Sequence, residues 1–220
     1  MMTLSEAIAA RHSVRRFTEK EIEKSAAHDL QEYIDECNRL SGFDFQLALN
    51  EPEAFSTRMA HYGSFRNCRN YIAAVGPKGE DEKCGYYGEK IVLKAQQLGL
   101  NTCWVALTYG KSKAHCNIPK GEKLYVVIAL GYGETQGFAH KSKSMNELCS
   151  VNGDMPNWFY GGMTAAMLAP TATNQQKFLL TLDNDTVYAK ALRGFYSKMD
   201  LGIVKYHFEI GAGNAEFKWR

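Results

Sequence analysis

The sequence predicts an α+β protein in which helices flank a mixed or antiparallel central sheet. Two kinds of periodicity support this class. In some segments apolar residues recur at helical spacing, and in others they alternate with polar residues as in a half-buried strand. Both kinds of segment are interspersed along the chain. With 220 residues, 45% of them hydrophobic, the chain is long enough to bury a sizeable core.

Helix and strand signals follow one another through the first part of the chain. Thr3 and Glu6 have capping-box spacing and predict a helix through Ala10. A similar signal at Thr18 predicts the start of a helix that ends at Ser41. A later apolar stripe predicts a helix ended by the glycine at position 99. The predicted strands cover residues 43–49, 71–75, 102–107 and 124–130.

The second part of the chain restarts this pattern. Pro156 precedes an Ala- and Met-rich helix that runs through Leu168. The expected elements that follow are a strand at 178–182, helices at 190–197 and 201–210, and a strand at 217–219. Short strings in both parts share the order of a strand followed by a helix with glycine near its end. We therefore expect two degenerate half-repeats, covering residues 1–150 and 151–220.

The amino-acid composition argues against several classes of function. The formal net charge is only +2, which argues against a nucleic-acid partner. None of the six cysteines forms a C-x-x-C pair, so we expect no metal site. Without a signal sequence, the cysteines indicate reduced thiols and a cytoplasmic location. No apolar run approaches the length needed to cross a membrane.

The segment Arg11–Phe17 has the strongest concentration of functional side chains. Three arginines, a histidine and a serine lie within six positions. If the segment is extended, Arg11, Ser13 and Arg15 share one side, with Val14 on the other. Guanidinium groups there suit a phosphate or a ring rich in carbonyl groups. An exposed basic strand has the same composition, so both interpretations stay open on these residues alone.

Two further stretches combine turn residues with possible ligand contacts. Residues 169–176 place Pro170 before a run of neutral hydrogen-bonding side chains, which suits a flat ring with polar edges. The same run also fits an ordinary polar turn after a helix. Residues 99–107 form a small-residue turn into an apolar strand and offer backbone amides. Trp104 in this strand is more typical of a core than of a ligand stack.

In this order, the three stretches resemble the FMN-dependent nitroreductase family. The shared motifs are R-x-S-x-R-x-F at residues 11–17, G-L-x-T-C-W at 99–104 followed by G-Y-G at 131–133, and A-P-[ST]-x-x-N-x-Q at 169–176. Asp200-Leu201-Gly202 also resembles the family's D-x-G helix. The resemblance implies a nitroreductase-like fold with FMN as cofactor and NAD(P)H as electron donor.

The resemblance also implies roles for individual residues. Arg11 would contact the ribityl chain and the O2 side of the flavin ring, Ser13 the ribityl or phosphate, and Arg15 the phosphate. Basic side chains after position 140 would add a phosphate contact, and backbone at 105–107 would lie near N5 and O4. The full set of expected cofactor contacts is Arg11, His12, Ser13, Arg15, Val105, Ala106, Leu107, Lys141, Lys143, Pro170, Thr171 and Asn174.

One departure from the family pattern concerns assembly. In the common arrangement the asparagine-bearing loop follows the first long helix and reaches the flavin of the other subunit. This chain has Arg39–Gly42 at that place and carries the loop in its C-terminal part. The arrangement resembles a tandem branch in which two half-copies form an internal pseudo-dimer. It implies a monomer able to bind flavin, with further homo-oligomerisation still open.

The implied activity is NAD(P)H oxidation by a ping-pong route, with hydride passing through the flavin to a nitroaromatic, a quinone or a similar small electrophilic acceptor. The flavin supplies the redox chemistry, so no catalytic side chain is expected. The alternative is a flavin-binding carrier, sensor or flavin-modifying protein without nitroreductase turnover. A nucleic-acid module is disfavoured by the low net charge.

Overall fold

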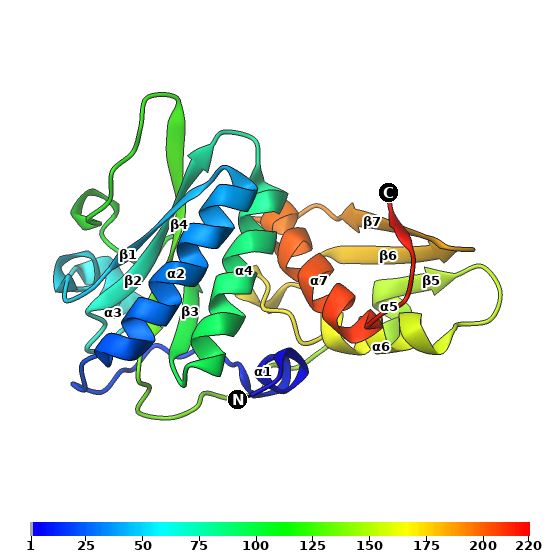
Figure 1. The fold of residues 1–220 in the computed structure, drawn as a ribbon, viewed down its shortest axis with the longest axis horizontal. Helices are drawn as coiled ribbons and strands as arrows, with labels where there is room; N and C mark the ends of the chain where they lie inside the picture. The colour runs from blue at the N-terminus through cyan, green and yellow to red at the C-terminus, as the bar shows by residue number, and fades with distance from the viewer. Residues whose placement is uncertain (1) are drawn as a thin grey trace. The chain divides into compact units, whose positions relative to one another are not determined.

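The computed structural model describes residues 2–220 and groups them into two units, each with its own four-stranded sheet. Unit 1 contains residues 10–80 and 90–139, and unit 2 contains residues 2–9, 81–89 and 140–220. Strands and helices alternate in both units (Figure 1). The predicted α+β class is confirmed, with the strands divided between two sheets. The expected half-repeats at 1–150 and 151–220 remain a prediction.

The sheet of unit 1 is entirely antiparallel. Its strands lie in the order β1 (Asp44–Ala48), β2 (Asn70–Pro77), β4 (Glu122–Gly131) and β3 (Asn101–Val105). The central strands β2 and β4 are buried along most of their length, as their continuous apolar runs predict. Strand β3 thus pairs with the buried strand β4 on one side. Its other edge is where the segment that carries Arg11 lies.

Helices complete unit 1. Helix α2 (Lys24–Ser41) packs on β1 and covers one face of the sheet (Figure 1). Short helices η1 (Pro52–Phe55), α3 (Arg58–Tyr62) and η2 (Lys111–Lys113) lie in the connections. Helix α4 (Asp81–Gln97) begins in unit 2 and ends in unit 1. A core cluster that includes Phe17, Phe55 and Tyr71 fills this unit.

The predicted start of α2 at Thr18 is wrong. Thr18 donates its backbone N–H to the carbonyl of Tyr132 at 2.8 Å, and Phe17 forms an antiparallel bridge with Gly133. The backbone here is thus already paired in an extended conformation, and the helix begins only at Lys24. By contrast, the capping box of α1 (Leu4–Ala10) is present: Thr3 Oγ1 accepts from the Glu6 N–H and Glu6 Oε2 accepts from the Thr3 N–H.

Unit 2 is built on a mixed sheet. Strands β5 (Cys149–Val151), β6 (Phe178–Asp183), β7 (Thr186–Ala191) and β8 (Lys218–Trp219) lie in that order, and only the β6–β7 pair is antiparallel. Helix α5 (Met145–Leu148) precedes β5. Helices α6 (Asn157–Ala166) and α7 (Ser197–Ala212) pack side by side (Figure 1). Short helix η3 (Ala172–Asn174) lies before β6.

The helix predicted at 190–197 is wrong. Residues 186–191 form β7, which pairs with β6 through the turn at 184–185, and residues 192–196 form a turn. Tyr188 and Lys190 are exposed whereas Val187 is buried, which is the alternation of a strand with one solvent face. Pairing with β6 therefore decides the conformation of this segment.

Helix α7 is the most deeply buried helix of unit 2. Gly202 passes so close to the start of α4 that a Cβ there would lie 1.9 Å from the Glu82 carbonyl oxygen. His207, fully buried, places Nδ1 3.1 Å from the Ala165 carbonyl oxygen and Nε2 2.9 Å from Glu89 Oε1. These contacts hold α4, α6 and α7 together. They thereby fix the position of the first turn of α7, which contacts the candidate site described below.

Residues 2–220 contain neither a membrane-spanning helix nor a cluster of metal-ligating side chains. None of the helices in this range is both long enough and apolar enough to cross a bilayer. In the same range, no group of three or more His, Cys, Asp or Glu side chains has an arrangement that could hold a metal ion.

Candidate flavin site

The segment that carries Arg11 lies along the free edge of β3. Ser13 forms a parallel bridge with Thr102, and the Val14 N–H donates to the Thr102 carbonyl at 3.0 Å. Val14 and Phe17 are buried in the core of unit 1, whereas Ser13 and Arg15 are exposed. The sequence folds this way because the two apolar side chains anchor the segment. The polar side chains between them are left at the surface.

Arg11, Ser13 and Arg15 come together beside one buried thiol. Burial raises the pKa of Cys103 on β3, while the charges of Arg15 and Arg11 and a hydrogen bond from Ser13 lower it. The Ser13 side chain is therefore hydrogen-bonded to this thiol, and both guanidinium groups are near enough for their charges to act on it. Arg11 is only 3% exposed, and no ion pair joins Arg15 to an acidic side chain within residues 2–220. Two guanidinium groups and a hydroxyl form a donor set that suits a phosphate.

Asn101 holds the turn that covers this segment. It is buried, accepts the Gly133 N–H through Oδ1 at 2.9 Å and donates through Nδ2 to Gln136 at 3.0 Å. A Cβ at Gly133 would lie 2.9 Å from both Asn101 Oδ1 and Val14. Only glycine allows so close an approach. Both partners of Asn101 lie more than 30 positions away, so the sequence around it gives no signal of this role.

The remaining candidates in unit 1 lie where β3 ends. Val105 is its last residue and is buried, the following Ala106 is half-buried, and the side chain of Leu107 is 69% exposed. His12 is half-buried next to Gly137, where a Cβ on the glycine would lie 2.8 Å from the Cβ of the histidine. These residues belong to the same unit as Arg11 and follow or flank the strand beside it.

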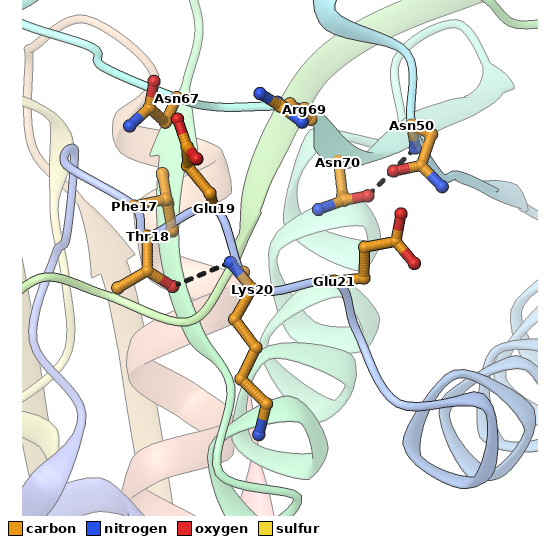
Figure 2. A pocket seen from close by; sticks show the side chains of 10 residues that line it. Phe17, Thr18, Glu19, Lys20, Glu21, Asn50, Asn67, Arg69 and Asn70 are labelled. Carbon is orange, nitrogen blue, oxygen red and sulfur yellow. Dashed lines mark hydrogen bonds between the residues drawn. The ribbon is translucent and has the colours of Figure 1, made fainter.

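A polar crevice on unit 1 is too small for a flavin (Figure 2). It has a volume of about 10 Å³, which is room for roughly one water molecule. Figure 2 shows Asn70 accepting the Asn50 N–H and Thr18 accepting the Lys20 N–H, so local contacts already use part of its polar lining. The lining residues are Phe17, Thr18, Glu19, Lys20, Glu21, Asn50, Asn67, Arg69, Asn70 and Gly131.

In unit 2, hydrogen bonds join the loop 170–176 to the basic segment 140–143. Gln176, 3% exposed, accepts the Lys143 N–H through Oε1 at 2.8 Å and donates through Nε2 to the Lys141 carbonyl at 2.9 Å. Asn174 donates to the same carbonyl, and Lys143 Nζ donates to the Gln176 carbonyl at 3.2 Å. The Thr171 hydroxyl accepts the Gln176 N–H. These hydrogen bonds bring together Lys141, Lys143, Thr171 and Asn174, and Pro170 directly precedes Thr171 in the loop.

The same loop has an unusual backbone. Thr173, Asn174 and Gln176 have φ angles of 50°, 55° and 48°, in the left-handed region. Non-glycine residues rarely adopt this region, and the energetic cost of several in one loop is retained where surrounding contacts fix the conformation. Such loops concentrate at ligand clamps and active sites. Here the side chains of Gln176 and Asn174 supply the fixing contacts.

Asp200 holds the other end of this loop from the first turn of α7. Its Oδ1 accepts the Ala172 N–H at 3.0 Å, and its Oδ2 accepts from Gln175 Nε2 at 2.9 Å. Burial raises its pKa to about 6, and the two hydrogen bonds oppose that rise. The motif D-x-G had drawn attention to Asp200, but its contact with the loop was not predicted because the partners are 25 and 28 positions away.

Comparison with solved structures places the chain in a fold class. A structure from Thermotoga maritima, described as a putative nitroreductase, is 24% identical with a TM-score of 0.65, covering 94% of this chain and 82% of that chain. One from Desulfovibrio desulfuricans, described as a putative nitroreductase in complex with FMN, is 17% identical with a TM-score of 0.55, covering 70% and 98%. At these identities the likeness shows the nitroreductase fold alone.

A family model gives the more specific result. The model described as "Putative TM nitroreductase" matches residues 3–212, which is nearly the whole chain. The chain belongs to this nitroreductase family, as its motifs had indicated. A search of curated proteins found no match.

Proposed function

We propose that this protein is an FMN-dependent NAD(P)H oxidoreductase that reduces small electrophilic acceptors such as nitroaromatics or quinones. The observation that carries the proposal is that Arg11, Ser13 and Arg15 lie on one segment bridged to the edge of β3, where Ser13 is hydrogen-bonded to Cys103 and both guanidinium charges act on that thiol. Membership of the nitroreductase family supports it, as does the similar fold of the Desulfovibrio protein described with FMN. A protein of the same fold from Parabacteroides distasonis is described as a "Putative NADH dehydrogenase/NAD(P)H nitroreductase", at 17% identity and a TM-score of 0.52.

The proposed roles follow from the position of each side chain. Exposed Ser13 and Arg15 would hold the phosphate end of the cofactor by charge-assisted hydrogen bonds. Buried Arg11 would lie at the ring, where its fixed charge favours electron density on the reduced flavin. Thr171 and Asn174 would supply hydrogen bonds from the loop of unit 2. The backbone at residues 105–107 would lie near the ring edge.

When bound, FMN supplies the two-electron chemistry that passes hydride from NAD(P)H to the acceptor in a ping-pong sequence. The protein residues bind and orient the cofactor, and none of them needs to act as a nucleophile. Because the Arg11 group and the Asn174 group lie on one chain, we also propose that a single chain supplies both sets of flavin contacts.

Purified protein tests the proposed function directly. We expect the visible absorption bands of an oxidised flavin, and anaerobic bleaching of those bands when NADH or NADPH is added. Addition of a nitroaromatic or quinone should then restore them. Flavin bands that neither nicotinamide donor bleaches would favour the carrier or sensor alternative. Protein that does not bind added FMN at all would contradict both interpretations.

A further inference from the structure

The loop 170–176 is fixed at two independent points. Gln176 ties it to residues 141–143, and Asp200 ties it to the first turn of α7. Gln176 lies within the family motif at 169–176, whereas Asp200 lies on a different element, helix α7. The Asp200 carboxylate is 4% exposed, and burying such a group costs free energy unless its partners repay it. Its retention at this position therefore calls for a role.

We propose that Asp200 is a positioning residue, whose ionised carboxylate holds the loop in the conformation that presents Thr171 and Asn174 to the flavin. This inference rests on the proposed function of the loop. Asp200 bonds directly to the backbone of Ala172, next to Thr171, and to the side chain of Gln175, next to Asn174. It thus acts on both expected flavin contacts through their immediate neighbours.

The hydrogen-bond pattern favours the ionised form. Both partners of Asp200 are donors: a backbone N–H and the Nε2 amide of Gln175. In a protonated carboxyl the hydroxyl oxygen is a poorer acceptor than a carboxylate oxygen, so one of the two bonds is weakened. Gln175 cannot compensate by turning its amide round, since Nε2 also donates to the Phe195 carbonyl. The turned amide would set its oxygen against that carbonyl.

The charged groups on the elements around Asp200 include Lys198 in the same turn, which is exposed, and Lys205 of α7, which is paired with Glu82 of α4. The groups that shift its pKa are the burial itself, Gln175 and Ala172, and no charged side chain is among them. Asp200 lies next to the loop 170–176 and to the turn at Phe195–Tyr196. The Tyr196 carbonyl of that turn accepts the Asp200 N–H. Near pH 6 the carboxyl therefore changes charge at the point where it holds the loop.

The effects of pH on flavin affinity and on fold stability should then have opposite signs. Burial raises the pKa of Asp200 from 3.8 to about 6 in the folded protein. Protonation therefore favours the folded state, and this contribution is lost as pH rises through about 6. Flavin binding instead needs the ionised form and weakens as pH falls through the same range. A residue that merely stabilised the fold would change the free energy of unfolding with pH but leave the affinity of the folded protein for flavin unchanged.

The test compares Asp200→Asn with the parent protein by FMN titration. The asparagine side chain reproduces the neutral form, and we expect affinity about tenfold weaker at pH 7.5, the usual effect of a lost hydrogen bond. At pH 5 most of the parent is protonated as well, so the ratio should fall to about twofold. The phosphate of FMN titrates in this range too, but it affects both proteins equally and cancels in the ratio.

Two other variants serve as the negative and the positive control for Asp200→Asn. Asp154→Asn makes the same chemical change at an exposed position of unit 2, and its FMN affinity should match the parent at each pH. Asn174→Ala should weaken FMN binding at pH 7.5, because it removes a loop contact directly. Without flavin, Asp200→Asn should be at least as stable as the parent at pH 7.5, since it no longer buries a charge.

Hydrogen exchange of the flavin-free protein separates this inference from the proposed function. At pH 7.5 the peptide covering 171–176 should exchange faster in Asp200→Asn than in the parent, because the Ala172 N–H loses its anionic acceptor. Unchanged exchange, equal FMN affinity, or a ratio that stays constant between pH 7.5 and 5 would each overturn the role of Asp200. If the parent fails to bind FMN while the exchange difference is present, the proposed function falls and the role of Asp200 in holding the loop stands.

Discussion

Replacing Arg15 by alanine is expected to weaken FMN binding by about 10- to 100-fold, as for the loss of a charge-assisted hydrogen bond worth roughly 1.5–3 kcal/mol. Arg15 is exposed, lies beside Cys103 with Arg11 and Ser13, and makes no ion pair with an acidic side chain within residues 2–220. Its guanidinium group can therefore engage a phosphate in two parallel bonds. Titration of flavin-free protein with FMN measures the loss.

Lys143→Ala is the matched comparison and should have a smaller effect. Lys143 Nζ already donates to the Gln176 carbonyl at 3.2 Å, so part of its role is to support the loop. Riboflavin, which lacks the phosphate, should bind the parent and Arg15→Ala with similar affinity. Equal losses of FMN affinity in both variants, or a greater loss for Lys143→Ala, would show that the phosphate lies elsewhere.

Replacing His207 by alanine is expected to destabilise the fold by about 3–5 kcal/mol, the usual cost of removing one partner of a buried ion pair or hydrogen-bonded charge. His207 and Glu89 are both fully buried. Nδ1 must donate to the Ala165 carbonyl, because a carbonyl oxygen can only accept. One proton is then shared between Nε2 and Glu89 Oε1, which lie 2.9 Å apart. The alanine variant leaves the glutamate buried without this partner.

Urea unfolding followed by tryptophan fluorescence measures this cost. Trp158 and Trp219 both pack against Phe208, next to His207 along α7, and should report its surroundings. His28→Ala is the control, since His28 is exposed on α2 and should cost less than about 0.5 kcal/mol. The double variant His207→Phe with Glu89→Leu removes both members of the pair and should be less destabilised than His207→Ala. A His207→Ala loss no larger than the control would contradict the structural role of the pair.

The sequence predicted well those elements whose own residues determine them. Strands β2 and β4 are continuous apolar runs, and α1 has a local capping box, so no distant partner is needed to recognise them. The segment 190–197 was assigned to a helix because its strand character depends on pairing with β6. Thr18 resembled a helix cap, but its N–H is bonded to Tyr132, far away in the sequence. Errors thus fall where tertiary pairing overrides the local pattern.

The candidate site divides in the same way. Residues within compact motifs, such as Arg11–Arg15 and Pro170–Asn174, could be identified because the motif places them together in sequence. Asn101 and Asp200 could not, because their significance lies in contacts with segments that only the fold brings near. A first-turn aspartate in a helix usually indicates no more than a favourable interaction with the helix dipole. Its burial and its bond to the Ala172 backbone distinguish it here.

The central proposal is that a single chain supplies both the Arg11 group and the Asn174 group of flavin contacts. Light scattering on size-exclusion chromatography of dilute FMN-loaded protein, with absorbance recorded at the flavin band, tests it most directly. We expect a species near the chain mass of 24.7 kDa that carries one flavin per chain, and flavin retention that does not change with protein concentration. Flavin lost in step with dissociation of an oligomer, or half a flavin per chain at saturation, would contradict the claim.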